Sequence, residues 1–293
     1  MTRMFSPRQV ALRAKQRYRK LRDRRAQTHT ATSRHPIEKD LAARFKRSEE
    51  WHHPQTPHLL AHLCDLHGSD KGTGDGVATP YPWPAHSYAD VYAQLFEHCR
   101  SSIKLVFECG IGSTDESMPY NMGQRGVPGA SLRVWRDYFP NADVVGADLD
   151  DGVLFEERRI RTFHVDQTSP TSVAAMWQAV GRRDFDLMID DGLHEPVGGL
   201  TLFEHSIELL APHGIYVIED VHPDHVPIYS DYFGSRDYRA SIVILRRSPG
   251  ELAWNNLIIV RKPWDQSSVG QAAPKSPLGE ASSQPDTGAT PPT

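Results

Sequence analysis

The sequence predicts a Rossmann-like α/β fold, in which a mostly parallel sheet carries helices on both faces and ends in an antiparallel strand pair. Short runs rich in Val and Ile recur through the middle of the chain, as buried parallel strands do. Helical stretches separate most of these runs, which is typical of repeated strand–helix units. The linker between the last two runs is too short for a helical crossover, so we expect those strands to pair antiparallel.

The apolar runs give the expected strands in chain order. They lie at 105–109 (LVFEC), 143–148 (DVVGAD), 162–165, 185–189 (FDLMI), 215–218 (IYVI), 241–245 (SIVIL) and 256–260 (NLIIV). The intervening helices are expected at 87–99, 130–138, 171–180 and 200–210. In the last of these, apolar residues keep the three- to four-residue spacing of an amphipathic helix.

The two ends of the 293-residue chain differ in composition from its middle. Residues 1–50 hold 15 Lys and Arg against 5 Asp and Glu, whereas the remainder holds 18 against 32. We therefore expect a basic arm at 1–57, partly helical or disordered, and one domain at 58–264. Residues 265–293 are rich in Pro, Ser and Gly and lack large apolar side chains, which predicts a disordered tail.

Composition also limits the cellular setting. The chain has no run of 18 apolar residues, so we expect no transmembrane segment. Its three cysteines form no CxxC pair, which excludes a disulfide scaffold and favours a reducing cytoplasm.

Polar residues follow the first three expected strands, where an α/β sheet binds its ligands. Asp148 is placed to accept hydrogen bonds from ribose hydroxyls, and Asp166 to hold an adenine amino group. Acidic side chains around one crevice suit a ligand with a ribose, an amine and a positive sulfur, so we expect S-adenosylmethionine. The residues expected to bind it are Glu108, Gly110, Gly112, Asp148, Asp166 and Gln167. A nicotinamide dinucleotide is disfavoured because Asp115 replaces the third glycine of GxGxxG.

The fourth and fifth strands end in carboxylates that we expect to meet at one edge of the sheet. The two runs are IDDGLH at 189–194 and VIEDVH at 217–222. Asp191, Glu219 and Asp220 would converge there, and three ionised carboxylates need a counter-charge. Mg²⁺ would supply it through oxygen ligands, and His194 would then take a proton as catalytic base. Helix capping and turn formation are the structural alternative for the same acids.

These motifs resemble one group of class I S-adenosylmethionine-dependent methyltransferases, the metal-dependent sugar O-methyltransferases of macrolide biosynthesis, of mycinamicin type. The similar strings are HGSDKG (67–72), HSYADVY (86–92), ECGIG (108–112), the run at 129–150, DQT (166–168), IDDGLH, YVIED (216–220) and WNNLIIVRK (254–262). The resemblance implies the same metal ligands and the same base as the residue pattern. Leu193 stands where the family often has Ser, and the loop after the first strand is extended at 117–129.

We therefore expect a Mg²⁺-dependent O-methyltransferase that acts on a hydroxyl of a sugar, a glycosylated natural product or a glycan. A homo-oligomer is compatible with the sequence. The first alternative is an RNA methyltransferase that uses the basic arm as a phosphate tether. The acidic body and the lack of an NPPY-like or DPPY-like motif argue against a nucleic-acid partner. The second alternative is a non-catalytic binding module on the same fold.

Overall fold

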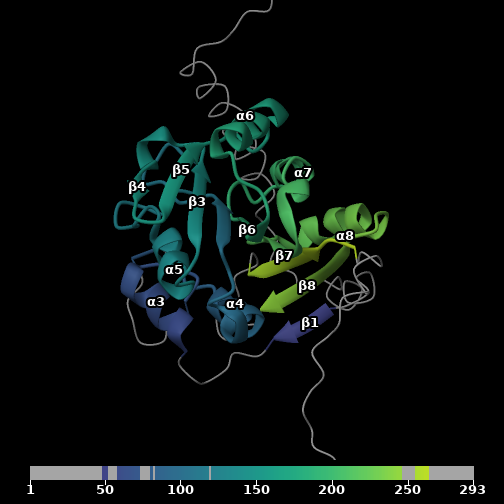
Figure 1. Cartoon of the computed structure of the whole chain (residues 1–293), viewed down its shortest axis with the longest axis horizontal. Coiled ribbons are helices and arrows are strands. Elements are labelled where there is room, and N and C mark those ends of the chain that lie inside the picture. The colour runs from purple at the N-terminus through teal and green to yellow at the C-terminus, as the bar shows by residue number, and fades with distance from the viewer. Residues whose placement is uncertain are drawn as a thin grey trace, which may run out of the picture. The chain divides into compact units, whose positions relative to one another are not determined.

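The computed structural model describes residues 48–51, 58–72, 80–81, 83–118, 120–245 and 255–263 (Figure 1). The expected disordered tail at 265–293 and most of the basic arm at 1–57 lie outside these residues. Four arm residues, Ser48–Trp51, form strand β1, which the sequence did not predict. The described strands form one sheet of nine, in the order β1-β8-β9-β7-β6-β2-β3-β5-β4.

The centre of the sheet is parallel, as predicted. It consists of β2 (Leu105–Cys109), β3 (Asp143–Asp148), β5 (Ile160–His164), β6 (Phe185–Asp190) and β7 (Leu210–Ile218). All five residues of β2 are buried, because helices cover both faces of this strand. The short strand β4 (Glu156–Glu157) pairs antiparallel with β5 at one edge.

The predicted antiparallel strand pair is confirmed. Strand β8 (Arg239–Leu245) pairs antiparallel with β9 (Asn256–Arg261), and β9 pairs antiparallel with β7. Strand β9, the last strand among the described residues, therefore inserts between β7 and β8. The parallel partner of β8 on its other side is β1.

Helices form a layer on each face of the sheet (Figure 1). Those on one face are α3 (Leu59–His67), α4 (Tyr88–Phe96) and α5 (Ala130–Tyr138). Those on the other face are α6 (Pro170–Val180), α7 (Pro196–Glu204) and α8 (Val226–Gly234). Alternating strand residues feed the two cores: in β2, Val106 packs with the first layer and Phe107 with the second.

The helix expected at 200–210 was placed wrongly. Helix α7 begins at Pro196 and ends at Glu204, and Leu210 already pairs with Phe185 as the first residue of β7. Proline favours the first turn of a helix because it has no N–H to bond there. The apolar residues Ile207 and Leu210 that extended the helical pattern are buried in the same core, but through a 3₁₀ turn and a strand.

Strand order reverses between β2 and β6. The chain runs from β2 outward to β3 and β5, then returns to β6 on the opposite side of β2. In such a sheet, ligands bind beyond the carboxyl ends of the strands at the reversal. The site residues predicted after β2, β3, β6 and β7 are thereby brought to one end of the sheet.

None of the described helices is long and apolar enough to cross a membrane. The three cysteines of the chain are free thiols, and Cys64 and Cys109 are buried.

Candidate active site

A pocket opens at the reversal of strand order. Several of the predicted site residues line it: Gly110, Gly112, Asp148, Gln167, Asp191 and His194. Met118 and Tyr120 from the extended loop after β2 line it as well. The structure thus joins four of the six expected cofactor residues with Asp191 and His194 in one space.

Gly110 is required by the packing of the backbone as well as by access to the pocket. Its φ of +88° lies in the left-handed region that favours glycine. A Cβ atom here would overlap the carbonyl group of Asp191, because the loops after β2 and β6 run side by side. Gly112 is likewise at +87°, and a Cβ there would meet the side chain of Met122.

The carboxylate of Asp148 anchors the loops around the pocket. One oxygen accepts a hydrogen bond from the backbone N–H of Ile111 and the other from that of Asp150, each at 2.9 Å. Burial raises the pKa of Asp148, although these backbone donors oppose the shift. A carboxylate has about four lone-pair sites, so both oxygens can still accept a hydroxyl donor.

Gln167 links two loops beneath the pocket. Its amide oxygen accepts from the backbone N–H of Leu193 at 2.8 Å, and its amide nitrogen donates to Asp190 at 2.9 Å. Burial raises the pKa of Asp190 to about 6, although the Gln167 donor opposes this shift. Gln167 therefore positions the IDDGLH loop while one edge of its side chain lines the pocket.

Two of the expected cofactor residues, Glu108 and Asp166, are not among those that line the pocket. Glu108 is fully buried, and its Oε2 accepts a 2.5 Å hydrogen bond from the indole of Trp135. Asp166 is also buried, and its Oδ1 accepts hydrogen bonds from the N–H and the hydroxyl of Thr168, which closes the turn before α6. The structural role that capping residues often play accounts for Asp166 here.

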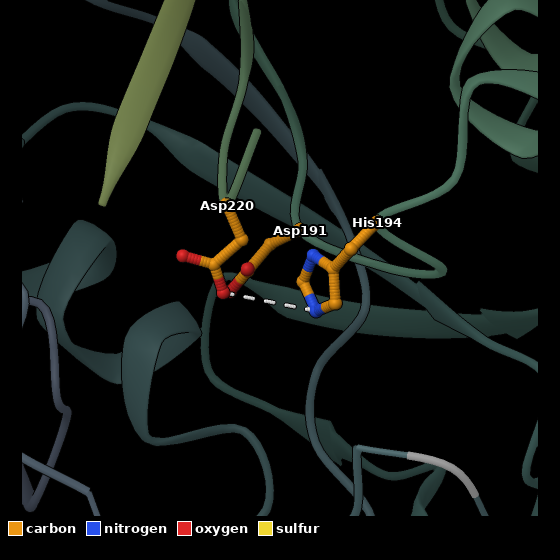
Figure 2. Close-up of side chains that lie close together, drawn as sticks. All are labelled: Asp191, His194 and Asp220. Atoms are coloured by element: carbon orange, nitrogen blue, oxygen red, sulfur yellow. Dashed lines mark ion pairs between the residues drawn. The ribbon is translucent and has the colours of Figure 1, made fainter. Parts of the chain in front are cut away.

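The side chains of Asp191, His194 and Asp220 lie close together (Figure 2), and the first two line the pocket. One ligand atom from each lies within 4.8 Å of the other two, as a metal site requires. The Nε2 atom of His194 is 3.7 Å from Oδ2 of Asp220. Both His194 and Asp220 have positive φ, at +58° and +52°, so tight turns after β6 and β7 aim these side chains at each other.

Glu219, the third predicted metal ligand, is held by other groups. Its Oε1 accepts a 2.6 Å hydrogen bond from the hydroxyl of Tyr92, and its Oε2 bonds the ammonium of Lys71. The same ammonium lies 2.6 Å from Oδ2 of Asp191 and 3.3 Å from Oε1 of Glu108. The counter-charge that crowded carboxylates demand is therefore present within the chain itself.

Electrostatics keeps this lysine charged. The side chain of Lys71 is 3% exposed, and burial alone would lower its pKa. Asp191, Glu219 and Glu108 more than offset that effect, so its pKa lies well above the usual range. Burial raises the pKa of Glu219 well above its usual range, and the positive charge of Lys71 opposes that shift.

Asp220 has a different environment from its neighbour. Its Oδ1 accepts a 2.5 Å hydrogen bond from the hydroxyl of Tyr88 and lies 3.3 Å from Nδ1 of His86. Burial alone would raise its pKa, but His86, His194 and the Tyr88 hydroxyl lower it on balance. Among Asp191, Glu219 and Asp220, only Asp220 has a lowered pKa, so it is the carboxylate that most readily stays ionised.

Sequence reasoning missed four residues that contact the carboxylates from the side of the sheet covered by α3 and α4. Lys71 belongs to HGSDKG, and His86, Tyr88 and Tyr92 belong to HSYADVY. Both strings supported the family resemblance, but no role was assigned to them. The segments are joined by backbone hydrogen bonds, including His86 N–H to Asp70 at 2.7 Å and Ala89 N–H to Lys71 at 2.8 Å.

Curated relatives show what the chain is similar to. It is 32% identical over 188 residues to 8-demethyl-8-alpha-L-rhamnosyl tetracenomycin-C 2'-O-methyltransferase of Streptomyces olivaceus, covering 64% of this chain and 44% of that protein. It is 33% identical over 138 residues to mycinamicin VI 2''-O-methyltransferase of Micromonospora griseorubida, covering 46% and 32%. The chain is therefore similar to sugar O-methyltransferases over part of their length. It spans less than half the length of these two relatives.

A solved structure supports the fold. The MycE methyltransferase from the mycinamycin biosynthetic pathway, in complex with Mg and SAH, matches with a TM-score of 0.51 and 21% identity. The match covers 75% of this chain and 58% of that one. The predicted class I methyltransferase fold, with its antiparallel C-terminal strands, is thereby confirmed. No family model matches the chain.

Proposed function

We propose that this protein transfers a methyl group from S-adenosylmethionine to a sugar hydroxyl of a glycosylated natural product, with Mg²⁺. The observation that carries the proposal is the cluster of Asp191, His194 and Asp220, two of which line a pocket at the strand-order reversal. The relatives support the reaction class, because both are named as methyltransferases for sugar hydroxyls. The free thiols suit a reducing, cytoplasmic location.

The cofactor is proposed to occupy the pocket between the loops after β2, β3 and β6. S-adenosylmethionine supplies an activated methyl group on a positive sulfur. Gly110 and Gly112 keep the backbone open to it, and Asp148 offers lone pairs to ribose hydroxyls. Glu108 and Asp166 act from behind the pocket, because both are buried and hydrogen-bonded to the protein.

The proposed metal ligands are Asp191, Glu219 and Asp220. Their oxygen atoms are the donors that Mg²⁺ prefers, so the residues fit the ion. When bound, Mg²⁺ would lower the pKa of an acceptor hydroxyl as a Lewis acid. Two of the three carboxylates already contact a cation, Lys71.

His194 is the proposed catalytic base. Its ring lines the pocket beside both Asp191 and Asp220, with Nε2 facing Asp220. Tyr120 packs edge-on against the ring, with 5.0 Å between the ring centroids. In this position the imidazole would take the proton of the sugar hydroxyl while the hydroxyl oxygen attacks the methyl group of S-adenosylmethionine. Proximity of the two reactants in one pocket supplies much of the rate.

Calorimetric titration of S-adenosylhomocysteine into the purified protein tests the cofactor. We expect micromolar binding, because the pocket combines apolar lining residues such as Leu149 and Val165 with polar groups such as Asp148 and Gln167. The titration is repeated with Mg²⁺ and with EDTA. Absence of binding in both conditions, from a sample with a cooperative thermal transition, would contradict the methyltransferase proposal and favour the binding module.

Asp191→Asn tests the metal site separately. We expect this variant to bind S-adenosylhomocysteine but to lose the response to Mg²⁺, because an amide cannot supply the anionic ligand. The matched control is Asp231→Asn, which changes an exposed carboxylate on α8. An unchanged Mg²⁺ response in Asp191→Asn would remove this residue from the proposed ligand set.

A further inference from the structure

We propose that Lys71 is an internal cation that holds the carboxylate cluster together before the metal binds, and that a divalent metal displaces it. The inference rests on the proposed function, because it concerns the same three metal ligands. It adds a residue that opposes metal binding and sets its strength.

The contacts of Lys71 carry the argument. Its Nζ atom is 2.6 Å from Oδ2 of Asp191, bonds Oε2 of Glu219, and is 3.3 Å from Oε1 of Glu108. The side chains of both glutamates are 0% exposed, so water does not screen these charges. Each of these buried charges would carry a large desolvation penalty if it were unpaired, so the ion pairs of Lys71 stabilise the cluster.

The lysine and the metal compete for the same two carboxylates. Asp191 and Glu219 are two of the three proposed ligands, and Lys71 bridges them. A divalent cation that binds both carboxylates would place two positive centres at one pair of oxygens, in a site with little water. The metal therefore binds all three carboxylates only after the ammonium has left Asp191.

The surrounding chain allows this movement. The backbone of Lys71 is fixed, since its carbonyl accepts from Ala89 N–H at 2.8 Å and the adjoining Gly72 carbonyl accepts from Ser87 N–H at 2.9 Å. The four-carbon side chain has rotatable bonds. Glu108, which is not a proposed ligand, remains as the acceptor for the displaced ammonium.

Charge gives the exchange its direction. Three carboxylates, Glu108, Asp191 and Glu219, contact one buried lysine, and a fourth, Asp220, lies beside Asp191, so the acidic groups outnumber the lysine and attract a divalent cation. Displacing Lys71 from Asp191 opposes that attraction. The ion pairs of Lys71 therefore stabilise the folded site when no metal is bound, and they lower its affinity for the metal.

The test compares Lys71→Met with Lys104→Met, a matched change at an exposed lysine. Mg²⁺ affinity is measured by calorimetry, and melting temperature is measured in EDTA and in saturating Mg²⁺. We expect Lys71→Met to bind Mg²⁺ about tenfold or more tightly than wild type. We also expect its melting temperature to fall in EDTA and to recover with Mg²⁺. An unchanged or weaker affinity would overturn the proposal, because a purely structural lysine gives no gain.

A measurement on the wild-type protein covers the case in which Lys71→Met does not fold. The ¹⁵N signal of the Lys71 ammonium, assigned with Lys71→Arg, is followed by NMR during Mg²⁺ titration. Displacement predicts a saturable shift of this signal, with none for Lys104. A Lys71 signal that stays constant while Mg²⁺ binds would contradict displacement.

Titration of S-adenosylhomocysteine separates the two levels of failure. Cofactor binding together with the wrong Lys71 response overturns only the lysine inference. Absence of cofactor binding from folded wild type overturns the proposed function. Absence of Mg²⁺ binding from both wild type and Lys71→Met overturns the lysine inference, whereas binding by Lys71→Met alone supports it.

Discussion

Replacing His194 with alanine is expected to lower kcat for methyl transfer by about 10²–10⁴-fold, the usual contribution of a positioned general base. The imidazole lines the pocket, and its Nε2 atom lies 3.7 Å from Oδ2 of Asp220. Transfer of labelled methyl from S-adenosylmethionine measures the effect. The first acceptor to use is 8-demethyl-8-alpha-L-rhamnosyl tetracenomycin C, which the name of one relative specifies.

Two controls make the His194 result specific. His194→Asn retains a side chain that tolerates the φ of +58°, so it separates loss of the base from backbone strain. His205→Ala removes an exposed histidine that bonds only a helix carbonyl in the described structure, and should leave kcat unchanged. S-adenosylhomocysteine affinity should be preserved in all three variants. A loss of kcat under tenfold in both His194 variants would exclude a catalytic base at this position.

Gly110→Ala is expected to destabilise the protein by more than about 3 kcal/mol. A left-handed backbone costs a non-glycine residue roughly 1–2 kcal/mol. The added Cβ would also overlap the carbonyl of Asp191 and push apart the loops after β2 and β6. Chemical denaturation measures the free energy of unfolding. Because the same loops border the pocket, we expect S-adenosylhomocysteine binding to be lost even where the variant folds.

Gly181→Ala is the matched control for this prediction. Gly181 ends helix α6 with a φ of +64°, yet a Cβ there would meet nothing within 4 Å. Its substitution reports the backbone cost alone, roughly 1–2 kcal/mol, and should leave cofactor binding unchanged. Equal destabilisation of the two variants would show that close packing against Asp191 contributes nothing.

Local pattern was sufficient for most of the sheet. The strand at Leu105–Cys109 was predicted to the residue, because a short run of apolar residues in this context has one stable solution, a strand buried on both faces. The same rule overextended the helix before β7. Ile207 and Leu210 are buried, as helical spacing required, but periodicity cannot tell a helix face from a turn that leads into a strand.

The site also contains positions that sequence pattern could predict and positions that it could not. Asp191, His194 and Asp220 were predictable because the carboxyl ends of neighbouring parallel strands share one edge. Glu108 and Asp166 have the expected residue type, yet Trp135 and Thr168 use their carboxylates inside the protein. Residue type at a strand end does not reveal whether the side chain turns toward the pocket or toward the core.

The sequence determined the fold class and the placement of acids at the strand ends, because both depend on short-range pattern and on the rules that parallel sheets obey. Only the tertiary structure revealed which cationic side chain forms ion pairs with those carboxylates. Lys71 is 120 residues from Asp191 and 148 from Glu219 along the chain, and packing of α3 and α4 against the sheet brings it between them. A long-range ion pair leaves no periodic signal in one sequence, since its partners are joined by the fold alone.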